Sequence, residues 1–177
     1  MARLPLHHRF VVLVVSVVIL PSCGDDGDDS GRPSGSTTTV AAAASCDPVA
    51  VDPLDPGSTQ HLLPGAPAPS YPTDPPTSGP HDAGDPVTGL QSTPLEKPLQ
   101  VTVLEVGGIV VQFRPDLGEE DRRLLTALAD EKVVVAPNPS LPAPVVATAW
   151  RRRLVCREFD VAAVQNFITD RKGKGPG

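Results

Sequence analysis

The stretch Gly107-Gly108-Ile109-Val110-Val111-Gln112-Phe113-Arg114-Pro115-Asp116 decides how this 177-residue chain folds. Its middle, Ile109–Phe113, is a short apolar run between a glycine pair and a proline, which is the pattern of a buried strand. The glycine pair predicts a turn or bulge, because it lacks the third glycine of a dinucleotide-binding fingerprint. The preceding run Leu99–Leu104, LQVTVL, is rich in residues that favour strands. The sequence therefore predicts two consecutive strands here.

The segment that follows predicts a helix and then a third strand. Leu117–Asp130 has helical apolar spacing, and acidic residues fill its first turn, where they suit the positive end of the helix dipole. Val133–Ala136 is expected to form a short buried strand. Pro137–Pro144, PNPSLPAP, is expected to be a rigid loop.

The last part of the chain predicts a strand pair and a second helix. Val145–Trp150 and Leu154–Phe159 flank Arg151–Arg153 and are expected to form a hairpin or two strands. Alternation along a strand would place the Arg152 side chain on the opposite face from Arg151 and Arg153. We therefore favour the interpretation that these arginines form a solvated sheet edge rather than an anion-binding site. Asp160 is expected to cap a helix whose apolar face holds Val161, Val164, Phe167 and Ile168.

These elements predict an α+β fold: a small, mostly antiparallel sheet with about two helices on one face. We assign the core to residues 99–172 and a flexible tail to residues 173–177. A core of this size is marginal by its surface-to-volume ratio. The preceding segment, residues 46–98, is therefore expected to complete it as an irregular arm packed on the domain.

Proline dominates that arm. The chain has 22 prolines, and 13 of them lie in residues 47–98, where missing amide donors keep regular elements short. A wholly disordered linker is the alternative. Recurring apolar residues argue against it, namely Leu62, Leu63, Tyr71, Val87 and Leu90.

The N-terminus predicts export. Arg3 and Arg9 precede the apolar run FVVLVVSVVIL at residues 10–20, which is too short to span a bilayer comfortably and is typical of a signal peptide. Leu20-Pro21-Ser22-Cys23 resembles a bacterial lipobox, with Pro21 as a mild departure. We therefore expect residues 1–22 to be a lipoprotein signal peptide. A retained signal anchor and ordinary cleavage nearby are the alternatives.

A lipid anchor at Cys23 would hold the mature chain at the membrane. Two acyl chains such as palmitate give stable anchoring where one is marginal. Residues 23–45 are small, polar and acidic, and we expect them to form a disordered tether rather than a calcium site, since the terminal glutamate of an EF-hand loop is missing. The expected location is the cell membrane, with the domain on the extracytoplasmic face.

Charge and cysteine content narrow the function classes. The net charge is −6, and the sequence lacks a row of lysines and arginines of the kind that binds the phosphates of a nucleic acid. We therefore expect no nucleic-acid partner. Outside the cytoplasm two cysteines usually pair, so Cys46 and Cys156 are expected to form a disulfide. A redox thiol pair is the alternative, although no Cys-x-x-Cys is present.

Three motifs are distinctive: Tyr71-Pro72-Thr73-Asp74-Pro75-Pro76-Thr77-Ser78-Gly79-Pro80-His81, Phe113–Asp116 and Ala147-x-Ala149-Trp150. Together they resemble the bacterial domain-of-unknown-function family numbered 3105. The likeness covers roughly residues 46–172. It implies signal- or membrane-anchored proteins of no established activity. Members commonly read His-x-Leu-Glu-His-Gly before the Arg-Pro-Asp strand, and here Thr102–Gly107 lacks both histidines.

With His81, that histidine pair would make a metal site. After residue 23 this chain has only His61 and His81, with Glu105 as a candidate carboxylate ligand. His81 and Glu105 also have a purely structural interpretation. Hydrogen bonding by His81 would lock its loop, and Glu105, placed in a strand, would pair with Arg114 or Arg151–Arg153 or face water.

Our first functional hypothesis is a surface lipoprotein whose domain binds an envelope protein or component without catalysis and without a cofactor. The alternative is a zinc or copper site at His61, His81 and Glu105, either degraded or still weakly competent. A purely structural tether is the third. The loss of the family's histidine pair supports a binding domain rather than an enzyme, and no Gly-x-Ser-x-Gly or Walker lysine occurs.

Overall fold

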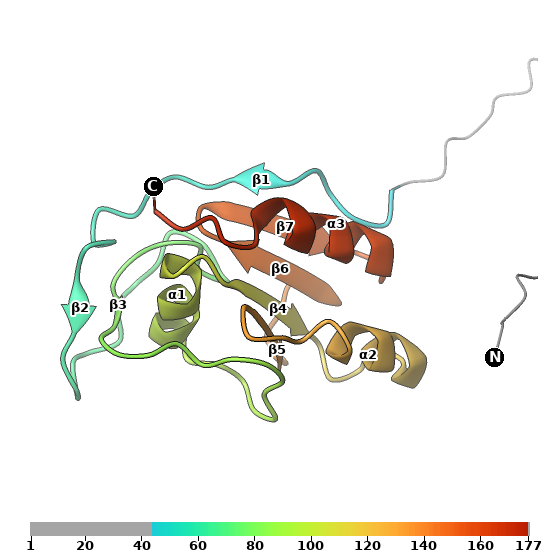
Figure 1. The fold of residues 1–177 in the computed structure, drawn as a ribbon, viewed down its shortest axis with the longest axis horizontal. Coiled ribbons are helices and arrows are strands. Elements are labelled where there is room, and N and C mark those ends of the chain that lie inside the picture. The colour runs from blue at the N-terminus through green and yellow to red at the C-terminus, as the bar shows by residue number, and fades with distance from the viewer. Residues whose placement is uncertain (1–43, 177) are drawn as a thin grey trace, which may run out of the picture. The chain divides into compact units, whose positions relative to one another are not determined.

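The computed structural model describes residues 44–176 (Figure 1). In chain order the elements are β1 (Ala50–Val51), β2 (His61–Leu62), β3 (His81–Asp82), α1 (Lys97–Glu105), β4 (Ile109–Phe113), α2 (Glu119–Thr126), β5 (Val133–Pro137), β6 (Val145–Ala149), β7 (Arg152–Cys156) and α3 (Val161–Arg171).

The main sheet has five strands in the order β1-β7-β6-β4-β5. The β4–β5 pair is parallel, with Val111 opposite Val135. The other pairs of neighbouring strands are antiparallel, and in the β4–β6 pair Val111 lies opposite Ala147. The predicted α+β class with a mostly antiparallel sheet is confirmed. β2 and β3 form a separate two-stranded parallel sheet.

Helices cover both faces of the sheet. α2 and α3 pack on one face, where Leu125 and Phe167 join the cluster that contains Val111 and Val135. α1 packs on the opposite face, against Val110 and its neighbours. The expectation of about two helices on one face was therefore wrong. All five residues of β4 are buried, as expected for a strand covered on both sides.

The run predicted as a strand over Leu99–Leu104 is instead the body of α1, and this correction matters for the site. Pro98 lies in the first turn of the helix, where a missing amide donor does no harm, and Gly107, with φ of +76°, follows its end. Gln100–Leu104 are all buried. A helix buried all round has no polar stripe, so its sequence resembles a buried strand.

The remaining elements lie close to their predicted positions. β4, β5 and the β6–β7 hairpin are confirmed, and α2 is shorter than predicted at both ends. Asp160 caps α3 as expected, because its side chain accepts a hydrogen bond from the Ala163 amide at 3.0 Å.

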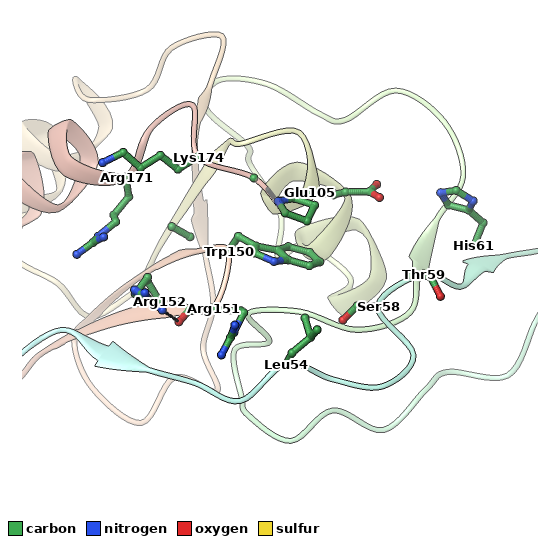
Figure 2. A pocket seen from close by; sticks show the side chains of 13 residues that line it. Leu54, Ser58, Thr59, His61, Glu105, Trp150, Arg151, Arg152, Arg171 and Lys174 are labelled. Carbon is green, nitrogen blue, oxygen red and sulfur yellow. Dashed lines mark hydrogen bonds between the residues drawn. The ribbon is translucent and has the colours of Figure 1, made fainter.

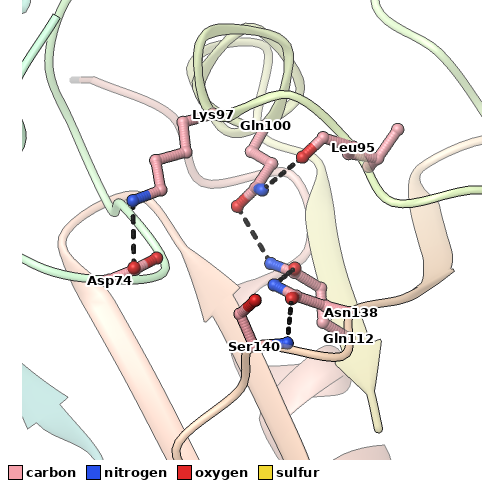
Figure 3. Close-up of polar contacts among 7 residues, drawn as sticks. All are labelled: Asp74, Leu95, Lys97, Gln100, Gln112, Asn138 and Ser140. Carbon is pink, nitrogen blue, oxygen red and sulfur yellow. Dashed lines mark hydrogen bonds and ion pairs between the residues drawn. The ribbon is translucent and has the colours of Figure 1, made fainter. Parts of the chain in front are cut away.

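A chain of buried polar side chains fixes α1 on the sheet (Figure 3). Gln100 donates to the Leu95 carbonyl at 2.8 Å and accepts from Gln112 in β4 at 2.9 Å. Gln112 in turn accepts from Asn138 at 2.7 Å, and Asn138 accepts from the Ser140 amide at 2.9 Å. Gln100 and Gln112 are fully buried, so these bonds satisfy groups that would otherwise destabilise the core.

The arm is tied to β7 at its start. Cys46 and Cys156 form the expected disulfide, and β1 pairs with β7 just beyond it. The buried carboxylate of Asp52, the residue after β1, accepts from Arg153 at 3.1 Å and from Thr77 at 3.2 Å. The arm thus supplies one partner of a shielded ion pair. It ends at Glu96, where α1 begins.

The N-terminal predictions lie outside the described residues. These are the signal peptide at 1–22, lipidation of Cys23 and most of the tether at 23–45. Within residues 44–176, no helix is long and apolar enough to cross a membrane. The segment expected to be a flexible tail begins beside α1, where the Gly173 amide donates to the Gly107 carbonyl at 2.7 Å.

Candidate functional site

The structure brings the three predicted candidates together. His61 is in β2, His81 in β3 and Glu105 is the last residue of α1, and one potential ligand atom from each lies within 4.8 Å of the others. The β2–β3 pairing places His61 directly opposite His81, and their rings meet edge to face with centroids 4.8 Å apart. Sequence spacing could not show this, because the two histidines belong to irregular parts of the arm.

His81 is the buried member of the cluster, with no exposed surface. Its Nδ1 lies 3.0 Å from the Gly79 carbonyl. A carbonyl only accepts, so Nδ1 carries the proton and donates. Nε2 lies 2.8 Å from a carboxylate oxygen of Glu105 and has no other partner among the described residues. Nε2 therefore faces the Glu105 carboxylate, and both groups are of the kind that bind a transition-metal cation.

Glu105 lies where the sequence did not place it. We expected it in a strand, paired with an arginine or facing water. It is instead at the C-terminal end of α1 and pairs with His81. The change follows from the helical state of residues 97–105. Its side chain is 33% exposed, so the carboxylate stays accessible to a ligand.

The signature segment from Tyr71 to His81 holds this cluster in place. Residues 75–81 are all buried. The Tyr71 hydroxyl donates to the Pro80 carbonyl at 2.7 Å, and burial, with a contribution from Asp82, raises the pKa of that hydroxyl. The expectation that His81 locks its loop by hydrogen bonding is thus consistent with the Gly79 contact, while Nε2 remains directed at Glu105.

Beside the cluster lies a pocket of about 770 Å³ (Figure 2). Its residues come from the arm, the end of α1, the β6–β7 turn and the segment after α3. His61 and Glu105 line one end, and the Trp150 side chain lies between them and the opposite end. Four cationic side chains gather at that opposite end, namely Arg151, Arg152, Arg171 and Lys174.

The arginine run does not form the solvated edge that we predicted. β7 is paired on both sides, by β6 and by β1, so it is an inner strand. Arg153 pairs with Asp52, whereas Arg151 and Arg152 line the pocket. Arg151 adopts a φ of +56° at the turn, so strand alternation does not apply to it.

Sequence reasoning missed Trp150, Arg171, Lys174 and Pro176 as pocket residues. The sequence indicated Trp150 only as the end of an expected strand and as part of the family-like motif. The basic composition of residues 171–174 was the available signal, but nothing in the sequence indicated that this segment returns to the end of α1.

Comparisons with known proteins give a family but no relative of known activity. A family model described as "Protein of unknown function (DUF3105)" matches residues 67–177, which is more than half of the chain. No curated protein and no solved structure matches the chain.

Proposed function

We propose that this chain, which belongs to the DUF3105 family of proteins of unknown function, is a binding domain that holds one zinc or copper ion on His61, His81 and Glu105. Imidazole and carboxylate groups are ligands that both metals accept. Three ligands leave at least one coordination position for a group from the pocket, since zinc takes four. The proposal concerns binding, and we assign no reaction.

The state of His81 is the observation that carries this proposal. Metal-binding histidines commonly donate their second ring N–H to a carbonyl or carboxylate, which fixes the ring and leaves the other nitrogen free to bind. His81 has this arrangement: Nδ1 donates to Gly79, and the buried Nε2 is directed at Glu105 and has no other partner among residues 44–176.

The cluster must adjust slightly to receive an ion. Two ligand atoms on one tetrahedral zinc ion lie about 3.3 Å apart, whereas Nε2 of His81 and the Glu105 oxygen are 2.8 Å apart. Glu105 is at the end of a helix and partly exposed, so its side chain can move without disturbing the core. His61 is exposed and equally free to reorient.

Calorimetric titration of the purified, chelator-treated chain with Zn²⁺ and with Cu²⁺ tests the site. We expect one ion per chain. The affinity should be at least about tenfold lower in His81→Gln and in Glu105→Gln, since removing a ligand costs at least as much as removing its supporting partner. Glu105→Gln tests the site where His81→Gln fails to fold. Glu119→Gln, an exposed carboxylate on α2, is the matched control. Absence of stoichiometric binding, or equal affinity in the site variants, would refute the proposal.

We further propose that the chain is lipid-anchored at Cys23 on the extracytoplasmic face of the cell membrane. The Leu20-Pro21-Ser22-Cys23 motif supports this, and so does the Cys46–Cys156 disulfide, because structural disulfides are typical of oxidising compartments. Cells fed an alkyne-tagged palmitate should label the chain, and Cys23→Ser should abolish the label while Cys46→Ser retains it. Equal labelling of the Cys23→Ser variant would contradict the anchor.

A further inference from the structure

We propose that the cationic end of the pocket binds the oxyanion group, phosphate or carboxylate, of a small organic ligand whose body lies against Trp150. The site consists of Arg151, Arg152, Arg171 and Lys174. It is separate from the histidine cluster and does not depend on the bound ion.

The first support is the charge at this end of the pocket. Twelve lysines and arginines lie in residues 44–176, and six of them pair with a carboxylate. Four of the other six are the pocket cations. Among the residues that the structure describes, Glu105 is the only carboxylate that lines the pocket, and it lies at the end opposite the cations (Figure 2). It pairs with His81. In a chain of net charge −6, this concentration of unneutralised positive charge favours an anionic ligand.

The second support is that the arginines are held in place but keep free donors. The Arg151 amide donates to the Thr77 carbonyl at 2.9 Å, and its Nε donates to the Asp52 carbonyl at 3.3 Å. Arg152 uses Nη1 to reach the Arg151 carbonyl at 3.0 Å. The buried Nε of Arg171 has no partner among the described residues. Each guanidinium has five N–H donors, so several remain for a ligand.

Guanidinium groups suit a planar or tetrahedral oxyanion. They form paired, charge-assisted hydrogen bonds to carboxylate and phosphate oxygens, which are stronger and more directional than those of a neutral donor. Lys174, exposed at the rim, adds a mobile charge. The structure thus indicates recognition of an oxyanion rather than of a halide or a neutral polar group.

Trp150 and the size of the pocket indicate what carries the oxyanion. Pockets for small molecules are usually about 300–1,000 Å³, and this one is about 770 Å³. The indole separates the cationic end from the histidine cluster and offers an apolar surface (Figure 2). A ligand with an anionic group and a flat or apolar body fits both features.

Trp150 also supplies the readout, because it is the only tryptophan in the chain. Its fluorescence in the full, metal-free chain is followed during titration with phenyl phosphate, benzoate and uncharged benzamide at constant ionic strength. We expect a saturable change with phenyl phosphate, with benzoate, or with both, and no saturable change with benzamide. Which anion binds more tightly distinguishes a phosphate ligand from a carboxylate ligand.

Variants of the pocket arginines test whether the anion binds at the cationic end of the pocket. Arg152→Gln and Arg171→Gln should each raise the Kd about tenfold or more, because each removes charge-assisted hydrogen bonds. Arg114→Gln and Arg123→Gln, at arginines outside the pocket, should leave it unchanged. The anion titration uses the metal-free chain, so failure of the metal site would leave its result unchanged. No saturable change with either anion, equal binding of benzamide, or full binding in both pocket variants would overturn the proposal.

Discussion

At Gly79 the backbone has a φ of +135°, and a Cβ added there would lie 2.8 Å from the ring of Tyr71. Both facts exclude an ordinary L-residue, because this φ is accessible mainly to glycine and the contact is shorter than carbon atoms tolerate. The carbonyl of the same residue accepts the Nδ1 proton of His81. One residue therefore sets both the path of the signature segment and the orientation of the candidate ligand.

Gly79→Ala should lower the free energy of unfolding by about 1–3 kcal/mol and weaken binding of Zn²⁺. Gly84→Ala is the matched control, since Gly84 has a similar φ of +130° but open space around it. Urea unfolding of the two variants separates the steric conflict from the backbone strain. Equal losses would show that the contact with Tyr71 contributes nothing.

At the level of elements, the sequence predicted the sheet better than it predicted the helices. β4, β5, the β6–β7 hairpin and α3 follow from short apolar runs, a cap and helical spacing, which are local signals. α1 did not, because Val101, Thr102 and Val103 are residue types that favour strands and burial on all sides removed the period of 3.6. Glu105 was misplaced for the same reason.

The buried amides between α1 and β4 test how strongly that helix is fixed. Gln112→Leu keeps the volume but leaves the Gln100 carbonyl oxygen and the Asn138 amide without partners, and each buried unsatisfied group costs about 1–3 kcal/mol. We expect a loss of at least about 2 kcal/mol in the free energy of unfolding. The same change at Gln165, exposed on α3, should stay within about 0.5 kcal/mol. Similar values for both variants would show that the amide chain is dispensable.

At the scale of the whole domain, distant segments of sequence are joined at a few points. The Cys46–Cys156 disulfide spans 110 residues, and the Asp52–Arg153 pair lies within the same closed loop. In the chain-entropy model, closing such a loop contributes about 4–5 kcal/mol. The disulfide was predictable from cysteine number and export, whereas the ion pair was not, because any carboxylate of the arm was an equal candidate.

The same long-range construction explains why the pocket was only partly predicted. His61, His81 and Glu105 were identified by residue type, as the few side chains able to bind a metal. Trp150 and Arg171 are ordinary residue types at ordinary spacing, and only the folded chain brings them together. The types of residue in the sequence could therefore indicate the end of the pocket with the histidines. The cationic end could be recognised only from the folded structure.

The segment after α3 has a practical consequence for anyone who handles this protein. Gly175 lies so close to the Glu105 backbone that a Cβ there would collide with its carbonyl oxygen, and Pro176 lines the pocket. An affinity tag fused to this end of the chain would follow closely after Pro176, which lines the pocket. A hexahistidine tag in that place would offer competing imidazoles beside His61, so purification handles belong elsewhere on the chain.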